Sequence, residues 1–196
     1  MVAYIYQKLL EEGVRAGQTP ARTRSARNWF RNLARQTTGV QPNTIIKTAP
    51  KVQLTRVPQV GFMYHFFYEP KMRDELPYYD RFPLVIAVDK TARGFTGLNL
   101  HYIAPRDRVK LLDALYDNLY NEDTVANTRI KVTYELLTSV TKMRFAKPCF
   151  KKYLAGHIKG TIRRVSAEDW DIVSMLPFQN FTINANTVYA ESRKKY

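Results

Sequence analysis

The sequence has 196 residues, which is enough for one domain of ordinary size or for one domain with an attached arm. Apolar residues make up 45% of the chain and aromatic residues 13%, so the composition excludes a disordered protein and predicts a buried core. The single cysteine, Cys149, allows no intramolecular disulfide and no cysteine-based metal site. No run of about 18 apolar residues is present, so we expect no membrane partner.

The net charge of +14 is concentrated near the start of the chain. Residues 1–58 hold seven arginines and three lysines against two glutamates, a net charge of +8, and no acid occurs from Gly13 to Pro58. Such an asymmetry indicates a basic segment that meets an anionic surface. We therefore divide the chain into a basic N-terminal arm, residues 1–58, and a compact body, residues 59–196.

Two amphipathic helices and a connector are predicted in the arm. The first helix covers residues 3–12 and ends at glycines. The second follows Thr19, a residue type that caps helices, and Pro20, which favours the first helical position, and it runs to about Gln36. Residues 40–58 hold three prolines among polar residues, which predicts an extended connector.

The second predicted helix has four arginines on one face, because they are spaced by three, four and four residues. This arginine stripe consists of Arg24, Arg27, Arg31 and Arg35. No acid nearby in the sequence neutralises it, so we expect negative charge to come from another molecule.

We predict that the arm binds its partner through two kinds of side chain. The cations expected to meet a partner's acids or DNA phosphates are Arg22, Arg24, Arg27, Arg31, Arg35, Lys47 and Lys51. Trp29, Phe30 and Leu33 lie on the other side of the helix and are expected to dock in a partner's apolar groove. The alternative is a solvated tail that keeps the protein soluble.

The body is predicted to contain an antiparallel sheet followed by helices. Alternation and a high content of β-branched and aromatic residues predict strands at 60–68, 82–89, 95–103 and 161–165. Apolar residues at helical spacing predict a helix at 105–120 that packs on the sheet. The remaining predictions are a helix or strand at 128–143, a helix or loop at 145–160, a capped helical turn at 166–177 and a last helix at 184–196. The expected fold class is α+β: a small antiparallel β-barrel with packed helices and an extended basic N-terminal arm, with an SH3-like barrel as the leading form.

The aromatic strand at 60–68 has two interpretations. Its rings could form a platform on which nucleic-acid bases stack. Exposed stacking rings are normally interleaved with Lys or Arg, and this strand contains neither. We therefore favour a role in the core.

No pattern of catalytic residues is found. The three histidines, His65, His101 and His157, are isolated and lack the spacing of metal ligands, so we expect them to be core or surface residues. Asp89, followed by Lys90 at the end of a predicted strand, is a weak candidate for a metal-dependent nuclease, and a turn acid is the favoured interpretation. We expect no enzyme activity, no cofactor, no metal and no small-molecule substrate.

Residues 62–117 resemble a block found in T4-like tailed bacteriophages, particularly those of marine cyanophages. The matching pieces are LPYYDRFPLV, GFTGLNLHYI with a proline soon after, and LLDALYD. They cover less than a third of the chain but have a specific order and spacing. The resemblance implies a conserved structural or assembly protein of cyanophage-type myoviruses, located in the virion and assembled in the bacterial host cytoplasm. Such proteins are described as structural or as protecting DNA ends, and no catalytic residue carries over.

Two functions are compatible with these observations. The favoured hypothesis is a non-enzymatic structural subunit of the tail, baseplate or neck that docks on other virion proteins through its arm. The alternative is a DNA-binding protein that protects or engages the ends of the phage genome, with arginines on the phosphates of double-stranded DNA. Because no base-reading motif is present, such binding would be weakly sequence-specific.

Overall fold

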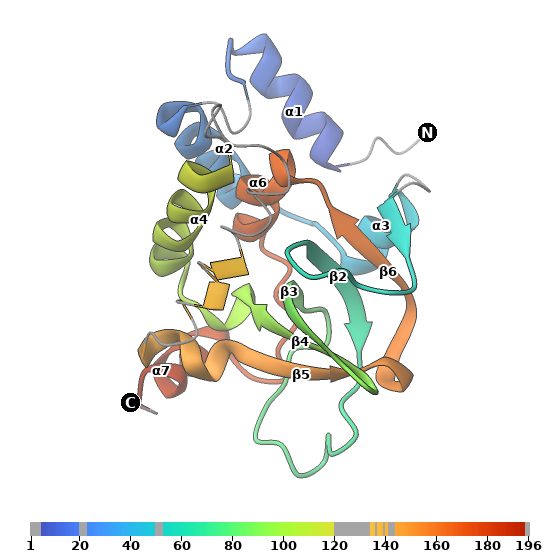
Figure 1. Ribbon diagram of the computed structural model, residues 1–196. Coiled ribbons are helices and arrows are strands. Elements are labelled where there is room, and N and C mark those ends of the chain that lie inside the picture. Colours follow the sequence, from blue (N-terminus) through green and yellow to red (C-terminus); the bar gives the residue numbers. More distant parts are fainter. Residues whose placement is uncertain are drawn as a thin grey trace.

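The computed structural model (Figure 1) describes residues 5–19, 23–49, 53–119, 134–135, 137–138, 140 and 144–194. Its longer elements are α1 (Ile5–Arg15), α2 (Arg24–Gln36), α3 (Pro42–Lys47), β1 (Leu54–Thr55), β2 (Met63–Tyr68), β3 (Leu84–Thr91), β4 (Gly94–Asn99), α4 (Pro105–Leu119), β5 (Phe150–Leu154), β6 (Ile158–Val165), α6 (Trp170–Met175) and α7 (Ala185–Lys194). Among these helices, none is long and apolar enough to cross a membrane.

Six strands form one antiparallel sheet in the order β1-β6-β2-β3-β4-β5. The α+β class and the β3–β4 hairpin are therefore confirmed. The predicted closed barrel is wrong, because the edge strands β1 and β5 do not pair with each other. β1 has only two residues, which offers too short an edge to close the sheet. The structure gives no support for an SH3-like form.

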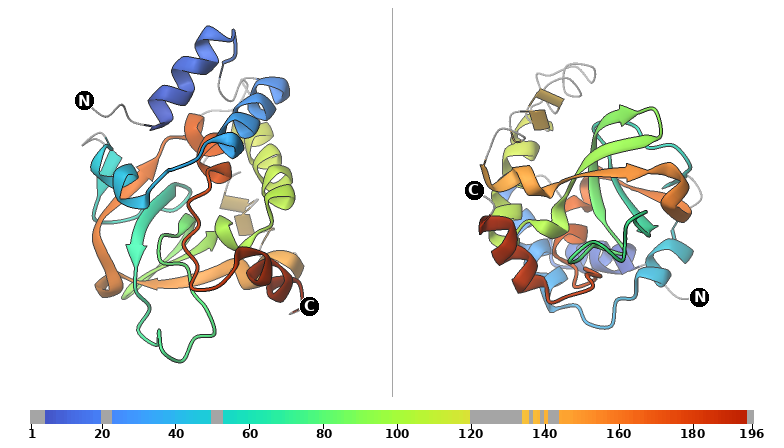
Figure 2. Two further views of the ribbon diagram at one scale, coloured as in Figure 1. Left: turned by 180° about the vertical axis from the view of Figure 1, so that it is seen from behind. Right: turned by 90° about the horizontal axis from the view of Figure 1, so that it is seen from below.

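The sheet nevertheless curls strongly, as the view from below shows (Figure 2). Register shifts occur where residues 65–67 of β2 face residues 159–163 of β6, with the extra residues in β6, and where residues 87–89 of β3 face residues 96–97 of β4, with the extra residue in β3. Each is a bulge, which bends its strand and increases the local twist. Bulges in β6 and β3, the strands on either side of β2, thus curve the sheet without closing it.

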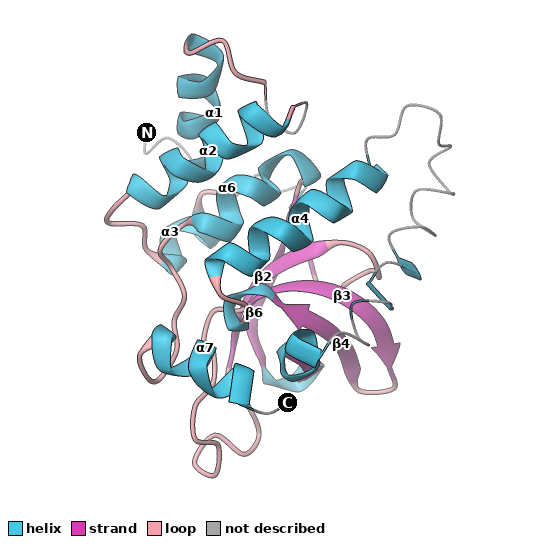
Figure 3. Cartoon of the chain, turned by 90° about the vertical axis from the view of Figure 1, so that its left-hand side faces the viewer, coloured by secondary structure: helices cyan, strands magenta, loops and turns pink. Residues whose placement is uncertain are grey.

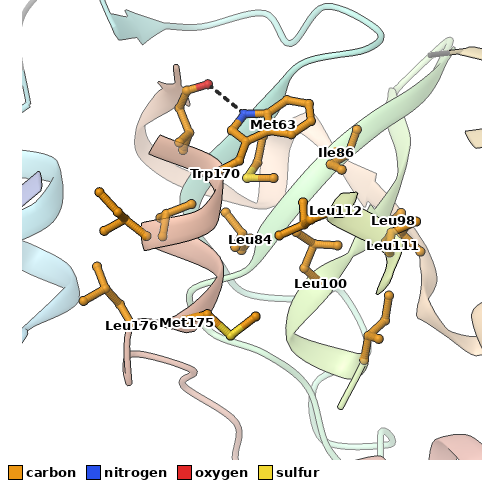
Figure 4. Close-up of a cluster of buried hydrophobic side chains, with 14 of the residues drawn as sticks. Met63, Leu84, Ile86, Leu98, Leu100, Leu111, Leu112, Trp170, Met175 and Leu176 are labelled. Carbon is orange, nitrogen blue, oxygen red and sulfur yellow. Dashed lines mark hydrogen bonds between the residues drawn. The ribbon is translucent and has the colours of Figure 1, made fainter. Parts of the chain in front are cut away.

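Helices cover one face of the sheet (Figure 3). Strand side chains such as Met63, Leu84 and Ile86 pack there against α4 and α6, and all three are fully buried (Figure 4). The indole of Trp170 in α6 also donates a hydrogen bond to the carbonyl oxygen of Val165 at 3.3 Å. This bond ties α6 to the end of β6.

The other face of the sheet packs aromatic rings against one another. Phe66 lies 5.2 Å from Tyr153 and 5.7 Å from Phe95 between ring centroids, in edge-to-face geometry. Tyr64 and Phe66 are at most 1% exposed, so β2 offers no stacking platform to a nucleic acid. The preference for a core role of this strand fits this burial.

The N-terminal helices lie against the body and do not form an extended arm. α2 contacts α6, and α1 contacts both. Buried side chains from α1 and α2, including Tyr6, Leu9 and Phe30, belong to the same core as the strands. The N-cap of α2 is Thr23, whose hydroxyl accepts from the amide of Ala26 at 3.1 Å, so the predicted cap at Thr19 is wrong.

Three further predictions needed correction. Residues 40–58 are not wholly extended, since the helix α3 forms there. β5 forms inside the segment predicted as helix or loop, because it adds an edge strand to β4. Ser166 makes no side-chain capping bond at the helical turn that follows it. Most of the ambiguous segment 128–143 lies outside the described residues.

The close packing of α1 on α2 can be tested by a substitution at their contact. A methyl group at Gly13 would lie 2.2 Å from Cζ of Phe30. Gly13→Ala gains about 1 kcal/mol in helix propensity, but overpacking at a fixed contact costs about 1–3 kcal/mol. We expect faster tryptic cleavage at Lys8 and Arg15 in this variant, with the body unaffected. Val14→Ala is the control, since Val14 is 71% exposed. Equal cleavage rates in the two variants would contradict the docked arrangement.

Candidate nucleic-acid interface

The arginine stripe is largely neutralised from within the protein. Asp113 of α4 lies 3.5 Å from Nε of Arg27 and 2.8 Å from Nη2 of Arg31, and Arg24 approaches it at 3.9 Å. Arg31 also contacts Asp171 of α6 at 2.6 Å. These acids lie 82 and 140 residues away from Arg31 in the sequence, so local inspection could not find them.

Burial makes this ion-pair network structural. Arg31 is 1% exposed and Arg27 is 6% exposed, and a charge at such depth must be paired. Burial raises the pKa of Asp171 to about 6, although the Arg31 guanidinium acts in the opposite direction. Arg27 and Arg31 therefore hold α2 against α4 and α6, which does not fit their predicted role in binding a partner.

The predicted apolar docking residues also face the protein itself. Phe30 is 1% exposed, and Trp29 and Leu33 are partly buried against the same core. The groove that accommodates them is formed by the chain's own body. Their predicted docking on a partner does not fit this placement.

A groove of about 610 Å³ runs between α2 and the start of α4, two helices that lie side by side (Figure 1). Its exposed cations are Arg35 from α2 and Arg106 and Lys110 from α4. Asn28 and Asn32 add side-chain amides. We call this surface the α2–α4 groove.

The α2–α4 groove has the chemistry of a phosphate-binding surface. No aspartate or glutamate is among the described residues that line it. Arg106 makes no ion pair with any described residue, Lys110 has a distant one at 3.9 Å to Asp107, and Arg35 only meets the sulfur of Met175 at 3.5 Å. The first turn of α4 adds the partial positive charge of a helix N-terminus. Three cations are thus left available to an anion from outside.

The remaining predicted cations lie elsewhere. Lys47 is exposed in α3, whereas Arg22 and Lys51 fall outside the described residues. Arg106 and Lys110 were not singled out from the sequence. Their spacing of four residues, on one face of a well-predicted helix, was the signal that could have found them.

The histidines and Asp89, the residues considered from the sequence for catalysis or metal binding, lie within the described part of the chain. His65 and His101 are fully buried, which lowers the pKa of both, and Nδ1 of His101 lies 2.7 Å from Asp80. Asp89 is exposed in β3 opposite Thr96. No three His, Cys, Asp or Glu side chains within the described part of the chain are arranged to hold a metal ion.

Truncating Arg31 should destabilise the protein far more than truncating Arg35. Arg31→Ala leaves Asp171 buried without its partner, and we expect a loss of about 3–5 kcal/mol in the free energy of unfolding at neutral pH. Arg35→Ala should change it by less than about 0.5 kcal/mol. The loss in the free energy of unfolding for Arg31→Lys should lie between the losses for Arg31→Ala and Arg35→Ala, because an ammonium cannot span two acids as a guanidinium does. Urea denaturation measures all three, and similar losses for Arg31→Ala and Arg35→Ala would refute the network's structural role.

The raised pKa of Asp171 predicts a specific dependence of stability on pH. Because an aspartate in the unfolded chain has a pKa of about 3.9, the folded protein binds more protons at this site between about pH 4 and 6. The contribution of Asp171 is therefore fully present below about pH 4 and is lost as the pH rises through about 6. Relative to Asp171→Asn, which cannot titrate, the wild-type protein should lose stability over this window. Denaturant titrations at several pH values measure the difference in the free energy of unfolding between the wild type and Asp171→Asn. That difference would stay constant over this window if Asp171 had an ordinary pKa.

Comparison with known proteins gives the chain's family. The family described as Phage T4 terminal DNA protecting protein matches residues 6–195. No curated protein and no solved structure matches the chain. The match confirms the resemblance to T4-like phage proteins. It overturns the expectation of a structural subunit of the tail, baseplate or neck, and it agrees with the alternative, a protein at DNA ends. Since the match spans nearly the whole chain, the protein belongs to the Phage T4 terminal DNA protecting protein family.

Proposed function

We propose that this protein binds the ends of linear double-stranded phage DNA and protects them by occupying them. The observation that carries the proposal is the α2–α4 groove, where three exposed cations lie together with no lining acid. The family description supports DNA ends as the target. A protein bound in this way would accompany the genome in the virion and in the host cytoplasm.

Phosphates of the DNA backbone fit the groove better than bases do. Arg35, Arg106 and Lys110 are long cationic side chains, and the asparagine amides between them donate hydrogen bonds. The ion-pair network of Arg31 fixes the two helices on which these cations stand. Contacts of this kind position a protein on DNA without reading its sequence, so binding should be weakly sequence-specific.

Protection by occupancy requires no catalytic chemistry. An exonuclease must reach the terminal phosphodiester bonds, and a bound protein excludes it sterically. We therefore propose a non-enzymatic role that uses no cofactor and no metal.

Exonuclease digestion of a linear duplex tests the proposed function. The triple variant Arg35→Ala, Arg106→Ala and Lys110→Ala should fold normally but lose protection. Each lost phosphate contact should also reduce the slope of log affinity against log salt by about 1, so the slope should fall by about 3 in all. The matched control removes three exposed cations outside the groove, Lys8, Lys71 and Lys147, and should retain protection.

A circular duplex distinguishes binding at ends from general binding. Relaxed, covalently closed circles, added as competitors, should displace the protein from linear DNA less well than linear duplexes of the same length do. If the groove triple variant protects ends as well as the wild type does, the groove is not the DNA site. If no variant and no wild-type preparation slows the exonuclease, the proposed function is wrong.

A further inference from the structure

A second cationic hollow lies at the open end of the curled sheet. The turn between β3 and β4 approaches the chain that joins β5 to β6, at the lower right of Figure 1, and the amide of Ala155 donates to the carbonyl oxygen of Arg93 at 2.9 Å. Together with residues 56–58, these segments enclose a pocket of about 420 Å³. We call it the sheet-end pocket.

Three cations surround the sheet-end pocket. Arg56, Lys90 and Arg93 all line it, all are exposed, and none makes an ion pair with a described residue. No aspartate or glutamate is among the described residues that line it. The pocket therefore attracts an anion, and its cations come from two separate segments of the chain, the β3–β4 hairpin and residues 56–58.

Unlike the α2–α4 groove, this pocket has an apolar floor. Pro58 and Ile158 are half-buried there and offer apolar surface, whereas Phe95 and Ile162, which also line the pocket, are each only 2% exposed. An apolar floor beneath a cationic rim suits a ligand with a flat apolar part attached to a phosphate. Nucleic-acid bases bind to proteins by stacking on such surfaces, while their phosphates pair with arginine and lysine.

The volume of the pocket restricts the size of the ligand that it can hold. About 420 Å³ lies in the lower part of the range for small-molecule sites, about 300–1,000 Å³. A segment of duplex cannot enter such a space, whereas one unpaired nucleotide can. In linear duplex DNA, unpaired nucleotides occur at frayed or overhanging ends, and a closed circle offers none.

We propose that the sheet-end pocket binds the terminal nucleotide of a DNA strand, with its base against the half-buried Pro58 and Ile158 and its phosphate at Arg56, Lys90 and Arg93. The inference rests on the proposed function and deepens it: the α2–α4 groove holds duplex backbone, and the sheet-end pocket recognises the end. The two sites share no lining residue, so each can be altered alone.

Titration with a fluorescent 5′-phosphorylated dinucleotide tests the pocket directly. Val57 lines the pocket and is 64% exposed, so substitutions there should not disturb the fold. Val57→Asp places a carboxylate beside the phosphate and should weaken binding at least tenfold, whereas Val57→Asn, of equal size but neutral, should not. Arg93→Ala should weaken binding by a similar factor, and Arg81→Ala, an exposed arginine outside the pocket, is its control.

An abasic dinucleotide with the same phosphates tests the floor. It should bind at least tenfold more weakly than the complete dinucleotide, because the contact with the apolar floor is lost. Equal affinities would overturn the proposal, since the pocket would then be an anion site alone. Equal binding by Val57→Asp and Val57→Asn would also overturn it.

The same dinucleotide separates this proposal from the proposed function. The groove triple variant should bind the dinucleotide normally while failing to protect duplex ends. Val57→Asp should still bind circular duplex but should lose its preference for linear DNA. If Val57→Asp keeps that preference, end recognition does not use the sheet-end pocket. This conclusion would hold whether or not the α2–α4 groove binds duplex backbone.

Discussion

The arrangement of this protein depends on one buried arginine. Arg31 contacts Asp171 of α6 at 2.6 Å and Asp113 of α4 at 2.8 Å, and it thereby joins three helices. A charge that is 1% exposed is tolerated only when both its partners stay in place. Any movement of α2 away from the body would leave two carboxylates without their cation. The ion pairs therefore specify where α2 sits, and the apolar contacts of Phe30 supply much of the energy that holds it there.

Fixing α2 has a consequence at the protein surface. Arg35 lies one turn beyond Arg31, so the same contact that buries Arg31 places Arg35 beside the first turn of α4. Arg106 and Lys110 project from that turn into the same groove. Three mobile side chains become a defined cationic surface because the helices beneath them cannot separate. Preorganisation of this kind reduces the entropy lost when an anion binds.

The curled sheet produces the second cationic surface by a different route. Bulges in β6 and β3 bend the sheet until its inner face is filled with aromatic rings. Since β1 is too short to pair with β5, the curl stays open, and the sheet-end pocket lies at its end. The cations of the pocket come from the end of β3, from the turn after it and from the segment that follows β1. A closed barrel, which the sequence predicted, would have no open sheet end at which such a pocket could form.

Elements that depend on local patterns could be predicted from the sequence. Features that depend on contacts between residues far apart in the chain could not. The hairpin of β3 and β4 and the helix α4 were predicted because periodicity alone defines them. β5 was missed because it is a strand only by pairing with β4, and closure of the barrel was wrongly expected because closure depends on which edges meet. The arginine stripe was read as unpaired because its acids are 82 and 140 residues away.

Counting cations is therefore a poor guide to where an anion binds in a protein of net charge +14. Arg108 and Arg163 are at most 1% exposed, as Arg31 is. Arg108 donates to the carbonyl oxygens of Ile103 and Ser174 at 2.6 and 2.7 Å, and so links the start of α4 to α6. These arginines use multiple fixed donors to connect backbone segments, which lysine cannot do as well. The cations that remain for a ligand are those whose charged groups are not held by the buried acids and carbonyls of the fold. Among the described residues, two hollows each bring three such cations together, one lined by polar groups and one with an apolar floor, and in our proposals this difference in lining separates a surface for the DNA backbone from a pocket for its end.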